Sequence, residues 1–376
     1  MRRLSIDPRP NWQKRVEQYG LHFHTLRGEP YWDESACYQF TNFEIDTLEL
    51  ATQTLHQMCL DLVQEVITER QFGLFMIPPE FEEFVIRSWE EDEPSVYGRF
   101  DLAYDGVGPP KLLEYNADTP TALLEAAIAQ WTWLKDVDER ADQFNSIHEK
   151  LIDAWKAVLA HDPGPVHFAA MSGQVEDYIT AEYLRDTAIQ AGFQTSYLDV
   201  EQIGWDRSRR MFVDQAGFPI HRLFKLYPWE WMIREEFGPH ILQSKTLWVE
   251  PAWKMILSCK SILPLLYQRH PESPFLLPAS FDPLPSGSYV RKPVHAREGS
   301  NIQVVEGGRM TLDTEGPYTA GPHVYQAIGP LKPHEGRYPV IGSWVVNGLA
   351  CGIGIREDDS LVTSNTSRFV PHQMVG

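Results

Sequence analysis

Apolar and polar positions alternate along residues 99–104 and 112–116, which predicts two β-strands. The connection over residues 105–111 is rich in glycine and proline, as is typical of a hairpin. In the first strand, Phe100 and Leu102 share one face, whereas Arg99 and Asp101 share the other. We therefore expect a hairpin with one apolar face and one charged face.

The charged face of this hairpin is the first candidate for chemistry. Folding brings Asp101, Glu114 and Asn116 together and places Arg99 beside them. Two carboxylates and an amide carbonyl are hard oxygen donors, which suit Mg²⁺ when phosphate oxygens and water complete its coordination. The alternative interpretation is an exposed sheet face with a surface ion pair.

The segment that follows favours the metal site. Apolar residues recur at helical spacing between residues 124 and 134, which predicts a helix directly after the second strand. Thr119 is a suitable N-cap and Pro120 suits the first helical position. Because a helix N-terminus attracts anions, we expect phosphate or carboxylate to bind here.

Two further patterns predict scaffold elements. From Thr41 a capping box with Glu44 and an apolar stripe over residues 48–66 predict a long core helix. Residues 166–171, 175–190 and 195–200 predict a βαβ unit after a lobe boundary at residues 162–165. Its 172–174 turn lacks the glycine triplet of dinucleotide-binding proteins.

Several polar residues remain open to two interpretations. Glu176 and Asp177 begin the helix of the βαβ unit, where they either offset the helix dipole or bind a ligand. A short helix over residues 253–263 carries Lys260, and a strand over residues 289–294 carries Lys292. Together with the polar turn at 297–301, these lysines suit a phosphate-binding clamp. Taken singly, each lysine is also typical of a surface position, and the chain contains no P-loop motif.

The last clear pattern is a hairpin over residues 340–355 with Asn347-Gly348 at its turn. Arg356 lies where this hairpin ends. Nearby aspartates at 358 and 359 would neutralise it locally unless Arg356 shares a site with other residues.

Composition narrows the function class. The 376 residues carry 52 acidic against 33 basic side chains, a formal charge of −19, which disfavours nucleic acid as a partner. No signal-peptide core or membrane-length apolar run is present, so we expect a cytoplasmic protein without a membrane partner. The four cysteines are scattered, which indicates reduced buried thiols rather than a disulfide framework or a cysteine nucleophile.

Taken in order, the motifs Arg-x-Asp, Glu-x-Asn-Ala-Asp-x-x-Thr, Val-x-Lys-Pro, Gly-Ser-Asn-Ile and Ile-Arg-x-Asp-x-Ser-Leu resemble the synthetase domain of glutathionylspermidine synthase. The resemblance covers most of the chain and is nearest to stand-alone bacterial acid–amine ligases without the amidase domain. It implies an α+β ATP-grasp fold with a small βαβ pre-ATP-grasp lobe and a lid subdomain. The expected parts are a metal- and substrate-binding sheet with helices (1–162), the pre-ATP-grasp lobe (163–248), the lid (249–335) and a return to the catalytic sheet (336–376).

The same resemblance implies roles for individual residues. It implies two Mg²⁺ ions with ATP as co-substrate, and it makes Arg99 and Arg356 the catalytic arginines that steady the acyl phosphate and the transferred phosphoryl group. The implied metal ligands are Asp101, Glu114 and Asn116. The implied ATP-binding residues are Arg99, Asp101, Lys260, Lys292, Glu298, Gly299, Tyr325, Gln326 and Leu361. The implied substrate-binding residues are Thr119, Thr121, Glu176 and Asp177.

We therefore expect an ATP-dependent carboxylate–amine ligase that forms an amide through an acyl phosphate, with a peptide carboxylate and a polyamine or another amine as substrates. Two alternatives stay open: a nucleotide-binding regulatory module without ligase activity, and a carboxylate kinase that stops at the acyl phosphate. Residues 172–175 and 226–228 differ from the pattern expected for glutathione and spermidine recognition. The acid, the amine and the oligomeric state are therefore not assigned.

Overall fold

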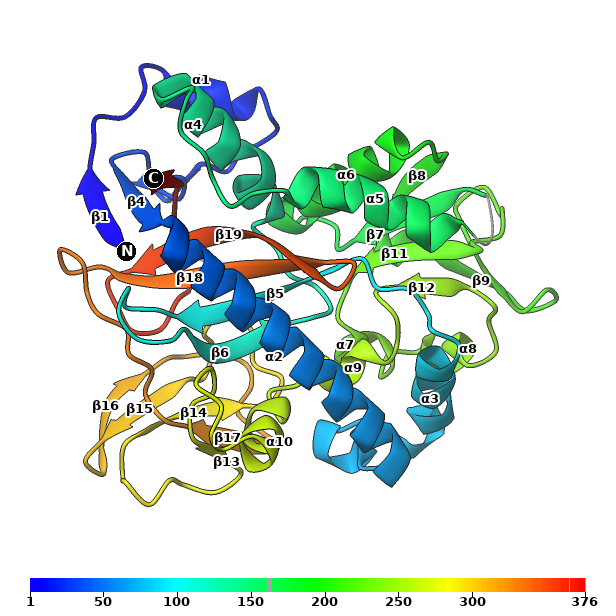
Figure 1. Cartoon of the computed structure of the whole chain (residues 1–376). Helices are drawn as coiled ribbons and strands as arrows, with labels where there is room; N and C mark the ends of the chain where they lie inside the picture. Colours follow the sequence, from blue (N-terminus) through cyan, green and yellow to red (C-terminus); the bar gives the residue numbers. More distant parts are fainter. Residues whose placement is uncertain (161–163, 365, 376) are drawn as a thin grey trace.

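A five-stranded antiparallel sheet runs through the middle of the molecule (Figure 1). The computed structural model describes residues 1–160, 164–364 and 366–375. Both predicted hairpins are confirmed, and β18 pairs with β5, so that the two hairpins form one sheet. In sheet order the strands are β20 (Arg368–Val370), β19 (Leu349–Asp358), β18 (Tyr338–Val346), β5 (Tyr97–Ala103) and β6 (Lys111–Asn116).

This central sheet separates two hydrophobic cores, as period-two alternation requires. One core contains Phe100 and Leu102 and packs against helix α2 (Asn42–Glu69), which crosses the sheet in Figure 1. The predicted capping box is present, because Thr41 and Glu44 exchange hydrogen bonds at the start of α2. The other core packs against α5 (Ile147–Leu159) and the π-helical segment Glu125–Ala129.

A second antiparallel sheet lies beside β6, in yellow and orange in Figure 1. Helix α10 (Ile262–Arg269) contacts both this sheet and α2, and so joins it to the rest of the molecule. Its strands, in order, are β13 (Ala279–Ser280), β17 (His323–Gln326), β14 (Tyr289–Pro293), β15 (Gln303–Glu306) and β16 (Arg309–Asp313).

The third large part is a four-stranded parallel sheet with α6 (Val175–Gln190) against it. The predicted βαβ unit is confirmed as β7–α6–β8. Residues 162 and 163 of the lobe boundary predicted at 162–165 lie outside the described residues. In order the strands are β12 (Leu247–Val249), β11 (Arg222–Leu226), β7 (Val166–Ala170) and β8 (Thr195–Asp199).

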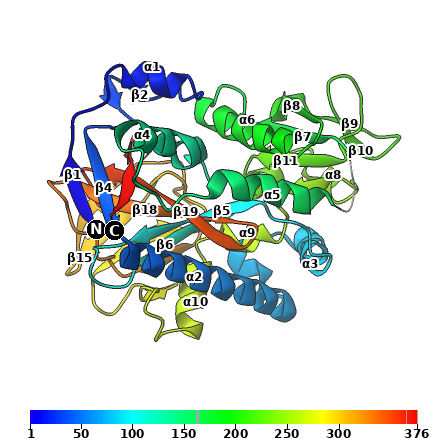
Figure 2. The ribbon, with the colours of Figure 1, turned by 45° about the horizontal axis from the view of Figure 1, so that its top comes forward.

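The two ends of the chain meet in a small sheet, as Figure 2 shows. Strand β4 (Ala36–Thr41) pairs with β1 (Arg2–Ser5) on one side and with β21 (His372–Val375) on the other. The remaining elements are α1 (Trp12–Glu17), β2 (Thr25–Leu26), β3 (Glu29–Pro30), η1 (Phe72–Phe75), η2 (Pro79–Phe81), α3 (Glu82–Glu90), α4 (Gln130–Val137), η4 (Val200–Gln202), β9 (Gly204–Asp206), β10 (Met211–Val213), α7 (Trp229–Met232), α8 (Gly238–Ile241) and α9 (Lys254–Leu257).

Two predicted helices have different boundaries in the structure. The helix expected at Thr119 and Pro120 begins only at Leu123, after Ala122 with a φ of 63°. The predicted capping by Thr119 is therefore wrong, because tertiary contacts hold this loop in an irregular path. The helix expected over residues 253–263 is broken into α9 and α10, and Lys260 lies in the turn between them.

Within the described ranges, all four cysteines are buried and free, as predicted. No helix in this part of the chain has the length and apolar character needed to cross a membrane.

Candidate active site

The β5–β6 hairpin brings together the four polar residues predicted from its alternation. Its register places Arg99 opposite Asn116 and Asp101 opposite Glu114. The Nδ2 atom of Asn116 donates to Asp101 Oδ2 and to Glu114 Oε1, at 3.2 Å each. The predicted juxtaposition is therefore confirmed, and the interpretation as an exposed face is wrong for Arg99 and Asp101, which are 6% and 3% exposed.

Asp101 lies between two arginines. Its Oδ1 accepts a hydrogen bond from Arg99 Nε at 2.7 Å, and its Oδ2 accepts from Arg356 Nη2 at 2.9 Å. Arg356 thus pairs with Asp101 rather than with the aspartates that follow it, and the aspartate at 359 pairs with Arg337 instead. Two guanidiniums facing one carboxylate leave local positive charge available for an anion.

A glycine in β18 makes room for this arrangement. Gly342 pairs with Asp101 across the sheet, and a Cβ at this position would lie 2.9 Å from Arg99 Cδ. That separation is closer than real Cβ contacts allow. Position 342 therefore needs glycine because the side chain of Arg99 crosses over it.

Glu114 faces two lysines that come from the neighbouring parts of the molecule. Lys260 Nζ lies 3.0 Å from Glu114 Oε2, and it also donates to the backbone oxygen of Ala296 at 2.6 Å. Burial acts to raise the pKa of Glu114, but Lys260 and Lys292 outweigh it and lower that pKa below its ordinary value. Glu114 is therefore an ionised carboxylate near neutral pH.

Lys292 connects the second sheet to the hairpin. Its Nζ donates to Gln326 Oε1 at 2.7 Å and to the backbone oxygen of Leu113 at 3.0 Å. Burial is the largest cause that lowers the pKa of Lys292, to about 8, while Glu114 acts to raise it. Gln326 in turn donates to Leu112 O, so strands β14 and β17 are both hydrogen-bonded to the backbone of β6.

Two small cavities meet at the hairpin and share Glu114, Gly299 and Thr363 in their walls. The first, of about 90 Å³, combines an apolar wall with the two lysines. Its lining includes Asp101, Lys260, Lys292, Gln326 and Leu361, together with Val290, Ile302, Val304, Leu331 and Val340.

The second cavity, of about 140 Å³, has a polar lining that contains all four predicted substrate-binding residues. Burial, with Glu176 and Glu298 nearby, raises the pKa of Asp177 to about 7. The polar lining comprises Tyr31, Arg99, Glu114, Asn116, Thr119, Thr121, Glu176, Asp177, Arg297, Glu298, Arg356, Thr363, Ser364 and Ser367.

The 297–301 turn closes over the point where the cavities meet. Glu298 and Gly299 both have positive φ angles, of 56° and 69°. A Cβ on Gly299 would lie 2.3 Å from the backbone oxygen of Thr363, so this approach of two loops requires glycine. Arg297 donates to Thr119 Oγ1 at 2.7 Å, which is one of the contacts that keep Thr119 out of a helix.

The donor set fits a hard divalent cation. Asp101, Glu114 and Asn116 converge as two carboxylates and one amide, and Glu114 is ionised. The amide of Asn116 presents its nitrogen to both carboxylates, and a rotation of that amide would present its oxygen to a metal. Within the described residues no group of three or more His, Cys, Asp or Glu side chains forms a metal cluster, so this mixed set depends on the amide.

One predicted residue lies away from the cavities. Tyr325 alternates with Gln326 along β17, and its ring packs edge-on against Tyr289 with centroids 5.2 Å apart. Its side chain is absent from the lining of both cavities.

The structure also adds residues that the sequence pattern did not assign. Asp118 accepts from Lys225 Nζ at 2.6 Å and from the backbone N–H of Trp229 at 2.9 Å, which joins the loop after β6 to the parallel sheet. Arg297 and Tyr31 line the polar cavity. Asp118 and Arg297 lie inside motifs that the sequence contains, whereas Tyr31 is distant in the chain and has no local signal.

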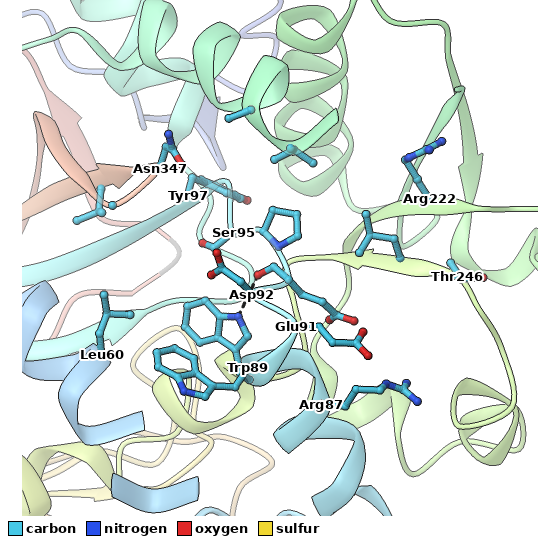
Figure 3. Close-up of a pocket in the computed structure, with 18 of the residues that line it drawn as sticks. Leu60, Arg87, Trp89, Glu91, Asp92, Ser95, Tyr97, Arg222, Thr246 and Asn347 are labelled. Carbon is cyan, nitrogen blue, oxygen red and sulfur yellow. Dashed lines mark hydrogen bonds between the residues drawn. The ribbon is translucent and has the colours of Figure 1, made fainter. Parts of the chain in front are cut away.

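A larger cavity lies elsewhere. Figure 3 shows this cavity, of about 870 Å³, between α2, α3 and the turn that joins β18 to β19. It shares no lining residue with the two cavities at the hairpin. Its labelled charged residues, among them Arg87, Glu91 and Asp92, surround it without forming a buried cluster (Figure 3).

Comparison with known proteins places the chain in a family. The family described as "Glutathionylspermidine synthase preATP-grasp" matches residues 3–375. A Haemophilus influenzae protein named "Putative acid–amine ligase" is 40% identical, with all of both chains covered.

More distant relatives are longer than this chain. A trypanothione synthetase of Crithidia fasciculata and a bifunctional glutathionylspermidine synthetase/amidase of Escherichia coli are each 29% identical. The matches cover 87% and 89% of this chain but only 54% and 58% of those proteins.

A solved structure supports the fold. A glutathione synthetase-like effector from Globodera pallida superposes with a TM-score of 0.57 over 90% of this chain and 89% of its own, at 9% sequence identity. This structural similarity, together with the sheets and helices described above, is consistent with an α+β fold of the ATP-grasp type. The chain therefore belongs to the glutathionylspermidine synthase family of ATP-dependent carbon–nitrogen ligases.

Proposed function

We propose that this protein joins a carboxylate to an amine through an acyl phosphate, with ATP converted to ADP and phosphate. The observation that carries the proposal is the cluster of Arg99 and Asp101, both buried, with the partly buried Arg356, at the point where an apolar and a polar cavity meet. Such a transfer needs positioning and charge compensation more than a protein nucleophile. The family membership supports the same reaction class.

The apolar cavity is the proposed ATP site. Its apolar wall suits an adenine ring, Gln326 and Leu361 line the same cavity, and Tyr325 precedes Gln326 in β17. Lys260 and Lys292 would face the phosphates, and the Glu298–Gly299 turn would cover them. A nucleotide needs more room than about 90 Å³. We therefore assign β13–β17 as a lid that moves away from β6 to admit ATP.

In this assignment the parallel sheet is the pre-ATP-grasp lobe, residues 249–335 contain the lid, and β18 and β19 return to the catalytic sheet. Two Mg²⁺ ions would be held by Asp101, Glu114 and Asn116 together with phosphate oxygens. When bound, magnesium would supply positive charge against the phosphate oxygens. The donor chemistry of the three side chains supports this assignment.

The two arginines, Arg99 and Arg356, have separate roles in the proposed reaction. In the first step the carboxylate of the substrate attacks the γ-phosphorus of ATP, and ADP leaves. Arg356 would stabilise the charge of the transferred phosphoryl group, and Arg99 would orient the acyl phosphate. In the second step the amine attacks the acyl carbon and phosphate leaves, while the closed lid excludes water.

The polar cavity is the proposed site for the acid and the amine. Thr119 and Thr121 offer hydroxyl and backbone groups to a peptide, while Glu176 and Asp177 provide negative charge for an ammonium group. The names of the relatives suggest a peptide acid such as glutathione and a polyamine such as spermidine. A cationic amine also suits the chain's net charge of −19.

The test is phosphate release measured with a panel of small peptides combined with diamines and polyamines. We expect release that requires both an acid and an amine, and loss of ADP formation in Asp101→Asn and Lys292→Ala variants. Unchanged turnover in either variant would overturn the proposal.

Two other outcomes distinguish the alternatives. A carboxylate kinase would form a hydroxamate with hydroxylamine but no amide with any amine. A regulatory module would bind ATP without acid-dependent release of phosphate.

A further inference from the structure

The proposed reaction requires a proton acceptor. Alkyl amines have pKa values near that of lysine, about 10.4, so they enter the site as ammonium ions, which have no free electron pair for attack. Glu114 is ionised but faces Lys260, and Asp101 is held by two arginines. The other carboxyl groups in or next to the polar cavity are therefore the candidates for the acceptor.

A tyrosine and a glutamate meet this requirement. Tyr31 Oη donates a hydrogen bond to Glu125 Oε1 at 2.7 Å, and the two residues are 3% and 1% exposed. Tyr31 lines the polar cavity, whereas Glu125 does not line it and is joined to it through the hydrogen bond from Tyr31. Among the described residues, Glu125 forms no ion pair with Lys, Arg or His, which is unusual for a buried carboxyl group.

The scaffold holds this pair firmly in place. Glu125 begins a π-helical segment, Glu125–Ala129, and such segments frequently occur at functional sites. The backbone N–H of Tyr31 donates to His24 O, and the backbone N–H of Phe369 donates to Tyr31 O. Backbone hydrogen bonds to His24 and Phe369 thus hold Tyr31 beside Glu125.

Charged groups from three elements face the pair. Glu176 from α6 acts to raise the pKa of Glu125 and of Tyr31, Arg99 from β5 acts to lower the pKa of Glu125, and Arg356 from β19 acts to lower that of Tyr31. Asp177 lies next to Glu176 on α6. Burial is the largest cause and brings the pKa of Glu125 to about 7.

We propose that Tyr31 and Glu125 form a proton relay that deprotonates the ammonium group of the incoming amine. The ammonium gives one proton to Tyr31 Oη while Tyr31 gives its own proton to the Glu125 carboxylate. The free amine attacks the acyl carbon, the bond from that carbon to the phosphate oxygen breaks, and the second nitrogen proton leaves with the phosphate. This inference rests on the proposed ligase function.

A second tyrosine–glutamate pair provides a matched control. Tyr38 Oη donates to Glu357 Oε2 at 2.8 Å, and both residues are buried. Arg3 also donates to both oxygens of Glu357, which supplies the cation that Glu125 lacks. Neither Tyr38 nor Glu357 lines either cavity at the hairpin.

The experiment compares two nucleophiles at the same acyl phosphate. Glutathione is supplied as the acid, together with either spermidine or hydroxylamine. If the panel finds another active acid and amine, these replace glutathione and spermidine. Hydroxylamine is largely uncharged at neutral pH and needs no relay. We expect Glu125→Gln and Tyr31→Phe to lower amide formation about 100-fold near neutral pH while hydroxamate formation stays within about twofold. Tyr38→Phe should change neither rate.

The pH profile separates this role from a structural one. Without the relay, amide formation should rise about tenfold per pH unit as the free-amine fraction increases. Equal loss of amide and hydroxamate in both variants, or unchanged amide formation, would overturn the relay. Selective loss in Asp177→Asn but not in Glu125→Gln would also overturn it and would make Asp177 the acceptor. A wild-type protein that forms no acid-dependent hydroxamate would refute the proposed function itself.

Discussion

The cavity between α2, α3 and the β18–β19 turn has a volume of about 870 Å³, whereas the two cavities at the hairpin have volumes of about 90 and 140 Å³. Most charged residues that line the large cavity are exposed, among them Arg87, Glu91, Asp92 and Lys245, although Arg222 is buried there. At the hairpin, Arg99, Asp101, Lys260 and Lys292 are all buried, and each contacts another polar group. Buried charges are costly unless they are paired, so their convergence indicates function more strongly than volume does.

The two regions also differ in how they are built. Three sheets and the loops between them converge on the hairpin cavities, and a nucleotide would enter where two of those sheets already touch through Lys292. The large cavity lies at the end of the central sheet, beside the β18–β19 turn. The comparison therefore predicts that substitutions at the hairpin lower the catalytic activity. Substitutions at the large cavity should leave the activity unchanged and alter at most the stability of the fold.

The largest effect is expected at Asp101. Asp101→Asn removes the negative charge between Arg99 and Arg356 and one proposed metal ligand, so kcat should fall about 1,000-fold or more. Phosphate release with the active acid and amine measures this loss. A thermal midpoint close to that of the wild type shows that the variant is folded. Losing a group that stabilises charge in the transition state usually lowers kcat by about 100-fold or more. A variant that keeps about a tenth of the wild-type activity would therefore contradict the assignment.

The next effect is expected at Lys292. Lys292→Ala removes a cation from the proposed phosphate site and the hydrogen bonds to Leu113 and Gln326. We expect kcat/KM for ATP to fall about 100-fold. Lys292→Arg keeps the charge and should recover part of the loss. Equal values for alanine and arginine variants would show that charge is not what this position supplies.

His56 in the large cavity should affect stability instead. Burial lowers the pKa of His56 to about 4, below its ordinary value of 6.5. The unfolded chain therefore binds a proton that the folded chain does not, and stability should fall by up to about 3 kcal/mol as the pH drops from 6.5 to 4. Denaturant unfolding of the wild type and of His56→Phe across this range measures the difference. A parallel pH dependence in both proteins would contradict it.

The smallest effect is expected at Asp92. Asp92→Asn makes the same chemical change as Asp101→Asn but in the exposed rim of the large cavity, and asparagine tolerates the φ of 51° at this position. We expect kcat within about twofold of the wild type and stability within about 0.5 kcal/mol. A large loss of activity would make the cavity in Figure 3 part of the catalytic site and would break the comparison.

The local patterns of the sequence determined much of the scaffold. Period-two alternation predicts the β5–β6 hairpin and the face that Arg99 and Asp101 share, and the capping box at Thr41 predicts the start of α2. These signals succeed because the steric preferences of the backbone and the burial of one face act over a few neighbouring residues. The order of motifs along the chain identifies the family.

Tertiary structure decided the rest. Thr119 and Pro120 have the local chemistry of a helix start, but Asp118 is bonded to Lys225 and Thr119 to Arg297, and these distant contacts keep the loop irregular until Leu123. Likewise, only the folded chain places Tyr31 against Glu125 and Arg356 against Asp101. Neither pairing has a local signal, because residues so far apart in sequence meet only when the sheets pack.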